Sequence, residues 1–278
     1  MSKPAFPCIG FIGAGNMASA LVGGLLAQGW PADRLWLSDT HEAQLQPHRE
    51  RGLNTTCDNV ELVAQVDMVV LSVKPQVMAE VLKPLATAVQ ARRPLLLSIA
   101  AGIPVTSLER WLGGALAIVR AMPNTPALVQ TGATGLYANP RVRDEQRRLV
   151  EQVLGAVGLT LWVEHEDLID AVTAVSGSGP AYFFQVMEAM IAAGTRLGLD
   201  PRDARALTLQ TALGAAQMAI ASDVDPAELR RRVTSPGGTT EQAVRVFTQA
   251  GLNDIFLQAM TACAERGGEL AAELGARD

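Results

Sequence analysis

The alternation of short apolar strands and helical segments predicts a doubly wound α/β domain, followed by an all-helical domain. Runs such as MVVLSV and LLLSI are apolar almost throughout, helical patterns separate these runs, and strand patterns are absent after Asp167. Continuously apolar strands are typical of parallel sheets that are covered on both faces. We therefore expect one domain over residues 1–165 and a second over residues 166–278.

The composition is that of a globular protein with a substantial core. Of the 278 residues, 49% are hydrophobic and 18% are charged, and this length is sufficient for two domains. The net charge of −5 gives no electrostatic reason to expect nucleic acid or an anionic membrane surface as a partner. The longest apolar tract, residues 18–27, is too short to span a membrane.

Cysteine usage and the start of the chain both predict a cytoplasmic protein. Cys8, Cys57 and Cys263 are widely spaced and odd in number, which excludes a disulfide framework and a thiolate zinc site and fits a reducing compartment. Prolines and glycines interrupt the first apolar run, which argues against a signal peptide. The three histidines have no ligand spacing, so we expect no metal site.

The predicted elements of the first domain alternate along the chain. Strands are expected at residues 8–12, 34–38, 68–73, 95–99, 117–120, 134–137 and 159–162. Helices are expected at residues 17–28, 41–51, 59–65, 78–88, 105–111 and 143–157. This order favours a sheet with helices on both faces.

The second domain is predicted to be helical throughout. Its helices are expected at residues 181–197, 201–221, 226–232, 240–250 and 253–274. Asp200 and Asp225 are each followed by proline, as at a helix start, and Asp225 with Glu228 has capping-box spacing. These Ala-, Gly- and Met-rich helices carry more apolar surface than one subunit can cover, so we expect a homo-oligomer built through them.

A glycine-rich turn, IGFIGAGNMA, joins the first strand to the first helix. Gly13, Gly15 and Ala18 have the spacing of a Rossmann-type dinucleotide-binding fingerprint. The first glycine allows the tight turn, the second lets the pyrophosphate approach the backbone, and the alanine lets the helix pack on the strand. The pyrophosphate would then lie at the helix N-terminus. The alternative is a glycine turn that serves packing alone.

Asp39 closes the second predicted strand and bears on the choice of coenzyme. A carboxylate at this position would bind the ribose hydroxyls and repel a 2′-phosphate, which favours NAD over NADP. The position also suits a turn aspartate that caps the next helix. The prediction is therefore NADPH or NADH, without a choice between them.

Three strand ends carry small, polar or proline-containing loops: SVKPQ, SIAAG at residues 98–102, and RAMPNTP at residues 120–126. Ligands of open α/β sheets bind at the carboxyl ends of strands. We therefore expect Val73, Lys74 and Pro75 to line the coenzyme crevice. Taken alone, Lys74 could equally be a solvated surface lysine.

Two further segments interrupt the helical pattern of the second domain. In VTSPGGTTEQAV, residues 233–244, the glycines and hydroxyls suit a pocket for a small anion. Alternatively, Thr239 caps the next helix and Gln242 completes a capping box. In SGSGPAY, Pro180 is expected to be the first residue of a long helix, with residues 176–179 as the turn before it.

In order and spacing, FIGAGNMA, SVKPQ, RAMPNTPALV, AVSGSGPAYFF and VTSPGGTTEQA closely resemble the pyrroline-5-carboxylate reductases, over about residues 8–270. SGSGPAY and TSPGGTT are the most specific of these motifs, because many dehydrogenases share the first one. The resemblance implies hydride transfer from NADPH or NADH to the cyclic imine 1-pyrroline-5-carboxylate, which gives L-proline. In the family, NADPH-preferring members often carry serine at the position of Asp39.

The resemblance also implies site residues. We expect the coenzyme to contact Gly13, Ala14, Gly15, Asn16, Met17, Ser38, Asp39, Asn59, Val73, Lys74, Pro75, Ala100, Ala101 and Asn124. We expect the substrate to contact Ser176, Gly177, Ser178, Ser235, Gly237, Gly238, Thr239 and Thr240. Within this set, the Thr240 hydroxyl is the candidate donor to the imine nitrogen, and the Met122–Thr125 loop approaches the nicotinamide.

Two other functions remain open for this sequence. The β-hydroxyacid dehydrogenases also pair a dinucleotide domain with a helical one, but they need a lysine shortly after a glycine-serine turn. The corresponding stretch, SGSGPAYFFQVMEAM, has no lysine or histidine, which favours imine reduction. The second alternative is a non-catalytic NAD(P)H-binding protein, which would give no reason for the TSPGGTT segment.

Overall fold

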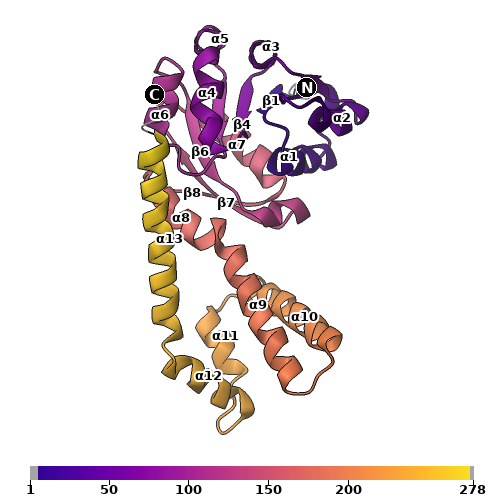
Figure 1. Ribbon diagram of the computed structural model, residues 1–278, viewed down its shortest axis with the longest axis vertical. Helices are drawn as coiled ribbons and strands as arrows, with labels where there is room; N and C mark the ends of the chain where they lie inside the picture. The colour runs from indigo at the N-terminus through magenta and orange to yellow at the C-terminus, as the bar shows by residue number, and fades with distance from the viewer. Residues whose placement is uncertain (1–5, 276–278) are drawn as a thin grey trace. The chain divides into compact units, whose positions relative to one another are not determined.

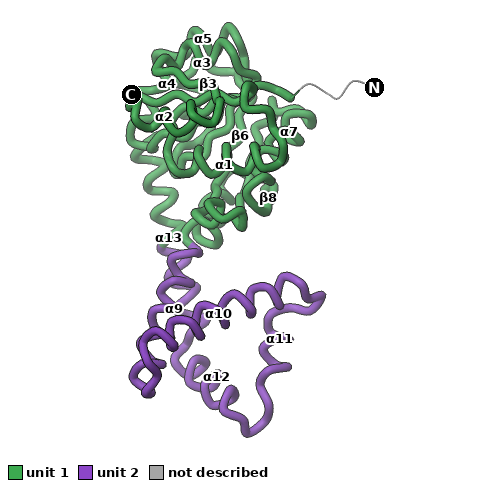
Figure 2. The backbone as a smooth tube through the Cα atoms, turned by 90° about the vertical axis from the view of Figure 1, so that its right-hand side faces the viewer, with its two compact units in different colours: residues 1–178, 263–278 green, residues 179–262 purple. Residues whose placement is uncertain are grey.

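The computed structural model describes residues 6–275. The chain forms two compact units, which Figure 2 distinguishes by colour. Unit 1 comprises the chain up to Ser178 together with the chain from Cys263 onward, and unit 2 comprises Gly179–Ala262. The domain limits of 1–165 and 166–278 stay a prediction, and the structure is described below by its units.

Unit 1 is built on one eight-stranded sheet, in the order β3-β2-β1-β4-β5-β6-β7-β8. The strands are β1 (Ile9–Ile12), β2 (Leu35–Ser38), β3 (Asn54–Thr56), β4 (Met68–Leu71), β5 (Leu95–Ser98), β6 (Ile118–Met122), β7 (Gly132–Ala138) and β8 (Gly158–Trp162). The first six are parallel, β7 is antiparallel to β6, and β8 is parallel to β7. The order of the first six places the topological switch point between β1 and β4, which is where dinucleotides bind in this fold class.

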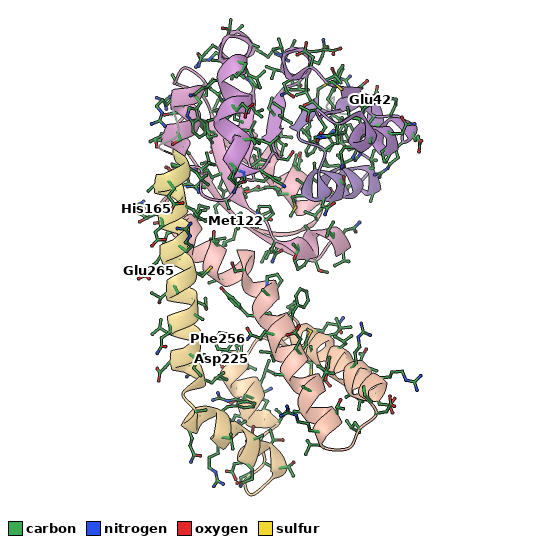
Figure 3. The ribbon with its side chains drawn as sticks, viewed as in Figure 1. Glu42, Met122, His165, Asp225, Phe256 and Glu265 are labelled. Atoms are coloured by element: carbon green, nitrogen blue, oxygen red, sulfur yellow. The ribbon has the colours of Figure 1, made fainter. Side chains whose placement is uncertain are left out.

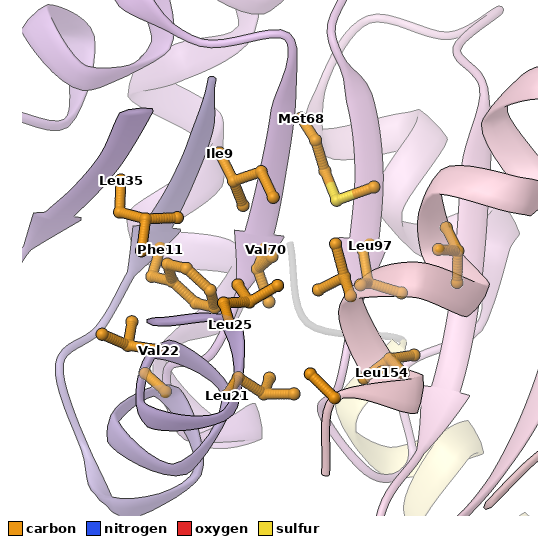
Figure 4. Packing of buried hydrophobic residues seen from close by; sticks show 14 of the residues in the cluster. Ile9, Phe11, Leu21, Val22, Leu25, Leu35, Met68, Val70, Leu97 and Leu154 are labelled. Atoms are coloured by element: carbon orange, nitrogen blue, oxygen red, sulfur yellow. The ribbon is translucent and has the colours of Figure 1, made fainter. Parts of the chain in front are cut away.

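Alternate residues of the apolar strands supply two separate cores, one on each face of the sheet. On β4, Met68 and Val70 belong to one core, whereas Val69 and Leu71 belong to the other. Figure 4 shows the first core, where strand residues such as Phe11 meet the apolar face of α1. A strand that is buried on both faces has no position for a polar residue, which explains the continuous apolar runs. The predicted doubly wound fold is confirmed.

The helices of unit 1 before Ser178 cover both faces of the sheet (Figure 1). They are α1 (Asn16–Ala27), α2 (Glu42–Glu50), α3 (Asn59–Gln65), α4 (Met78–Leu82), α5 (Ala86–Arg92), α6 (Val105–Trp111), α7 (Asp144–Gly155) and α8 (Leu168–Val172). The single helix predicted over residues 78–88 was wrong. A 3₁₀ turn at Lys83–Leu85 divides it, because Pro84 has no N–H to donate and its ring disrupts α-helical bonding.

The segment expected to be a turn at residues 176–179 is helical except at Ser178. A π-helical stretch, Thr173–Gly177, follows α8 directly and leads through Ser178 into α9 (Gly179–Arg196). The Ser178 amide donates to the Thr173 carbonyl at 2.8 Å, which is the i to i−5 bond of a π turn. The proline is tolerated because it is the second residue of α9, where an N–H has no intrahelical partner.

Unit 2 is helical throughout, as predicted. Its helices are α9, α10 (Pro201–Ile220), α11 (Pro226–Arg232), α12 (Thr239–Gln249) and the first part of α13 (Leu252–Gly275). Asp200 accepts a hydrogen bond from the Arg202 amide and Asp225 accepts one from the Glu228 amide, so both predicted N-caps are confirmed. Among the described residues, no helix is both long and apolar enough to cross a membrane.

Candidate functional site

The glycine turn after β1 is held in place by the neighbouring strands. Gly13 has φ of +98°, and a Cβ at this position would lie 2.9 Å from the backbone of Ser72. The Gly13 amide donates to the Ser38 carbonyl at 2.8 Å, and the Ser72 hydroxyl donates to the Gly13 carbonyl at 2.7 Å. Only glycine therefore fits here, because both the left-handed conformation and the close approach exclude a side chain.

Gly15 has no such intramolecular reason to be glycine. Its φ of −72° is open to any residue, and a Cβ would meet no protein atom within 4 Å. Gly15 and Asn16 are exposed at the start of α1, where no side chain caps the helix and the first turn has no acidic residue. An exposed helix start with uncapped amides and no acidic residue in its own first turn fits a pyrophosphate. The packing interpretation explains Gly13 but not Gly15.

Asp39 is bonded to the glycine turn itself. Its carboxylate accepts hydrogen bonds from the Ala14 amide at 3.0 Å and from the His41 amide at 2.9 Å. Partial burial alone would raise the pKa of Asp39, but these backbone hydrogen bonds and the neighbouring His41 outweigh burial and lower it. The site therefore carries a fixed negative charge beside the turn. The choice between NADH and NADPH stays a prediction.

Ser38 and Asn59 form a polar pair at the end of β2. The buried Ser38 hydroxyl donates to Asn59 Oδ1 at 2.6 Å. This bond fixes the Asn59 side chain at the first residue of α3, whose N-cap is Asp58. The pair brings two predicted coenzyme contacts together, with Asn59 Oδ1 already in use as an acceptor.

The loops after β4 and β5 contain the remaining predicted coenzyme contacts. β4 ends at Leu71, so the strand predicted to reach residue 73 is shorter, and Lys74 lies in the loop beyond it. Lys74 is exposed and makes no ion pair with any residue that the structure describes. The loop with Ala100 and Ala101, of which Ala100 is buried, continues to Gly102, which packs on α13.

The MPNT loop and the SGSG segment lie against each other within unit 1. Asn124 Nδ2 donates to the Ser176 carbonyl at 3.0 Å. A Cβ on Gly177 would lie 2.6 Å from the terminal methyl of Met122, a residue labelled in Figure 3 at the end of β6. The Ser178 hydroxyl lies 3.2 Å from Cys263 Sγ. The structure therefore joins a predicted coenzyme contact to the predicted substrate contacts of this segment.

The TSPGG turn of unit 2 differs from the capped turn that the sequence allowed. Gly238, not Thr239, is the N-cap of α12, and no side chain caps this helix. The Thr239 capping box was therefore wrong. Instead, Glu241 accepts a hydrogen bond from the Gly237 amide at 2.8 Å, so this amide is not free for a ligand. Ser235, Thr239 and Thr240 are exposed.

Two residues important to these turns were not nominated from the sequence. Ser72 supports the glycine turn through bonds to the Ile12 and Gly13 carbonyls, and its position immediately after a buried strand was the available signal. Glu241 occupies the Gly237 amide, and its position three residues after the N-cap was the available signal. Among residues 6–275, no group of three or more His, Cys, Asp or Glu side chains could hold a metal ion.

Two family models match the chain. Residues 8–102 match the family described as NADP oxidoreductase coenzyme F420-dependent, and residues 166–270 match pyrroline-5-carboxylate reductase dimerisation. Together with the open glycine turn at the switch point of the sheet, these matches define an NAD(P)-dependent oxidoreductase with a Rossmann-type domain and a helical domain.

Relatives of known identity narrow this class. A pyrroline-5-carboxylate reductase from Pseudomonas aeruginosa is 55% identical over 97% of this chain and 98% of its own. A structure of the Coxiella burnetii reductase has a TM-score of 0.93 at 44% identity, covering 96% of this chain and 99% of its own. A structure of the Plasmodium falciparum pyrroline carboxylate reductase with NADP bound has a TM-score of 0.84 at 29% identity, and it covers 95% of this chain and 98% of its own. The chain belongs to the pyrroline-5-carboxylate reductase family.

Proposed function

We propose that this chain transfers a hydride from NADPH or NADH to the C=N carbon of 1-pyrroline-5-carboxylate and so forms L-proline. The observation that carries the proposal is the 55% identity to a pyrroline-5-carboxylate reductase over 97% of the chain. That length includes the open glycine turn of unit 1 and the TSPGG turn of unit 2, so it covers the residues assigned to both the coenzyme and the substrate.

Unit 1 supplies the coenzyme site in this proposal. The bound coenzyme supplies the hydride from its nicotinamide ring. The amides at the start of α1, left uncapped beside Gly15, donate hydrogen bonds to the pyrophosphate. Asp39 and Asn59 face the adenosine ribose, and Lys74 with Ala100 and Ala101 lines the crevice at the carboxyl ends of β4 and β5.

Unit 2 supplies the carboxylate site. The Gly237 amide is held by Glu241, and the Gly238 amide donates to the Ser235 carbonyl. The donors left for the substrate are the Thr239 and Thr240 amides at the start of α12 and the exposed hydroxyls of the turn. Each hydrogen bond to a charged group contributes about 1.5–3 kcal/mol, so several together bind a small acid without an arginine. Ser235 supports the substrate from the opposite end of the turn.

Thr240 holds the imine nitrogen through its hydroxyl. A threonine hydroxyl does not titrate near neutrality, so its role is to orient the nitrogen. The proton arrives with the substrate, as the protonated imine, or from water. The protonated imine is the better hydride acceptor. If the substrate arrives in this form, the site needs only hydroxyl and amide donors and no strongly acidic side chain.

The active form is a homo-oligomer assembled through the helices of unit 2. Apolar side chains such as Phe183, Leu213 and Leu257 are exposed there by 67%, 52% and 68% in the single chain, more than a free subunit commonly leaves in water. The acidic balance fits a small-molecule enzyme with no nucleic acid partner. The three cysteines are free, which fits the reducing cytoplasm.

Initial rates of NADPH and NADH oxidation with 1-pyrroline-5-carboxylate test this function. Rapid oxidation that depends on the imine, with proline as the product, is the expected result. Oxidation at background with both coenzymes, while either one still binds, would contradict the reductase and favour an NAD(P)H-binding protein. Rapid reduction of NAD or NADP by a β-hydroxyacid would favour the dehydrogenase instead.

A further inference from the structure

The side-chain amide of Asn124 connects three segments of unit 1. Asn124 follows β6 and is only 9% exposed. Its Oδ1 accepts a hydrogen bond from the Ala133 amide of β7 at 2.9 Å, and its Nδ2 donates to the Ser176 carbonyl at 3.0 Å. A buried amide that uses its acceptor and its donor in this way is positioned to hold backbone segments together.

The Ser176 carbonyl lacks its usual α-helical donor for a reason that is visible in the sequence. In an α-helix, the carbonyl of residue 176 accepts from the amide of residue 180. Residue 180 is proline and has no N–H. The local backbone is also π-helical, with the Ser178 amide bonded to the Thr173 carbonyl. Asn124 supplies the donor that Pro180 lacks.

A second contact joins the same two segments. A Cβ on Gly177 would lie 2.6 Å from the terminal methyl of Met122 and 3.6 Å from a methyl of Thr173. Any larger residue at position 177 would displace the Met122 side chain. The MPNT loop and the SGSG segment are therefore packed together as well as hydrogen-bonded.

We propose that Asn124 is a positioning residue that sets the distance between the MPNT loop and the SGSG segment. The inference rests on the proposed function, together with the family resemblance, which implies that the MPNT loop approaches the nicotinamide and that the SGSG segment contacts the substrate. Its role is thus to act through the Ser176 carbonyl, and not to bind the coenzyme as we expected from the sequence. A misplacement of about 1 Å is enough to lower a rate about 10²-fold.

Asn124→Asp tests the proposal. Aspartate keeps an oxygen for the Ala133 amide but places a second acceptor against the Ser176 carbonyl, so this bond is lost. We expect the rate constant of hydride transfer, measured in single turnovers from the loss of reduced-coenzyme absorbance, to fall on the order of 10²-fold. We expect the Kd of the coenzyme, measured by its fluorescence, to change less than about threefold. A loss of folded protein would reduce only the amplitude of the single turnover.

Asn139→Asp is the matched control. Asn139 is also buried and lies near the opposite end of β6. Its side-chain amide accepts a hydrogen bond from the Ile118 amide and donates one to the Leu116 carbonyl. Its variant should cost stability without changing the hydride-transfer rate constant. If Asn124→Asp does not fold, Asn124→Ala removes the same bond without the repulsion and is measured instead.

The outcomes separate this inference from the proposed function. A wild-type chain that reduces no imine defeats the function before the variants are compared. An Asn124 variant with an unchanged rate constant overturns the positioning role. A variant whose coenzyme Kd rises tenfold or more at an unchanged rate constant also overturns it and makes Asn124 a coenzyme contact.

Discussion

Gly13 in unit 1 and Gly237 in unit 2 both have left-handed backbone conformations at turns that precede a helix, with φ of +98° and +71°. Gly13 is held by residues far away in the sequence, since Ser38 and Ser72 bond its backbone. Gly237 is held by Glu241, four residues further on, and a Cβ there would meet no atom within 4 Å. The first turn is therefore stabilised by neighbouring strands of the sheet, whereas the second is stabilised by contacts between residues close in the sequence.

The difference extends to the two units. Unit 1 has two cores of buried residues on the two faces of its sheet. Within unit 2, only Gly179, Ala204 and Thr208 are buried in the single chain. A coenzyme turn can therefore be completed by one chain, whereas the helices that present the TSPGG turn need further burial. A second copy of the chain is the natural source, in keeping with the proposed homo-oligomer.

The largest expected effect is on the turn of unit 2. Thr240→Ala should lower the rate of turnover about 10²-fold, as does the loss of one oriented donor in other enzymes. Thr248→Ala is the control, because Thr248 is an exposed threonine on the same helix whose hydroxyl bonds only the Val244 carbonyl. Steady-state kinetics at saturating imine check the prediction, and near-native turnover of Thr240→Ala would remove this hydroxyl from the mechanism.

The second prediction concerns the coenzyme turn. Gly15→Ala should leave the fold intact, because a Cβ there meets no protein atom. The added Cβ should keep the pyrophosphate away from the backbone amides, so that a hydrogen bond to a charged group worth about 1.5–3 kcal/mol is lost. The Kd of the coenzyme should therefore rise about 10- to 100-fold. Gly23→Ala also adds a Cβ in open space on α1 and should bind normally. Equal affinity in the two variants would show that the pyrophosphate does not approach the backbone at Gly15.

A smaller effect is expected on coenzyme choice. Asp39→Ser should raise the ratio of kcat/KM for NADPH to that for NADH about tenfold, because a carboxylate near a 2′-phosphate costs about 1–4 kcal/mol depending on solvent exposure. Asp33→Asn removes an exposed charge before the opposite end of β2 and should leave the ratio unchanged. A ratio that does not move in Asp39→Ser would mean that this carboxylate serves only the turn.

The smallest effect concerns pH and stability in unit 1. Burial, with a contribution from the charge of Arg51, lowers the pKa of His48 below its usual 6.5. The folded state thus favours neutral His48, and this contribution is complete above pH 6.5 and lost as the pH falls toward the lower folded pKa. The free energy of unfolding should therefore decrease on acidification, by no more than about 1.4 kcal/mol per pH unit for one proton.

Unfolding by denaturant at several pH values checks this slope. His48→Gln should abolish the contribution, so the stability difference between wild type and variant should shrink below pH 6.5. His165→Gln changes an exposed histidine and should run parallel to the wild type. Parallel curves for His48→Gln as well would show that His48 does not titrate differently on folding.

Prediction from the sequence worked where the signal was local and strong. The apolar strands at 68–73 and 95–99 and the proline-capped starts of α10 and α11 were found close to their true limits. β3 was missed, because Asn54–Thr56 is a three-residue polar strand with no apolar pattern. The helical stretch Leu168–Gly177 was missed because its α-helical part is only five residues long and because its β-branched residues have low helix propensity.

The site divides in the same way. The glycine spacing, the strand-end loops and the TSPGG turn were visible, since each lies within a few consecutive residues. The spacing of Gly237 and Glu241 was compatible with the hydrogen bond between them. The same sequence, however, was equally compatible with Thr239 as the helix cap. The bond from Asn124 to Ser176 had no local signal, because 52 residues separate its partners.

By itself, the sequence determined the division into an α/β part and a helical part, the position of the coenzyme turn and the family. These follow from residue periodicity, backbone preferences and motif order, which are properties of neighbouring residues. Only the tertiary structure decided the strand order, the open space at Gly15, the π-helical path through Ser176 and the partner of Asn124. Each of these depends on which distant segments pack together, and hydrogen bonds between such segments form only after the strands have taken their places in the sheet.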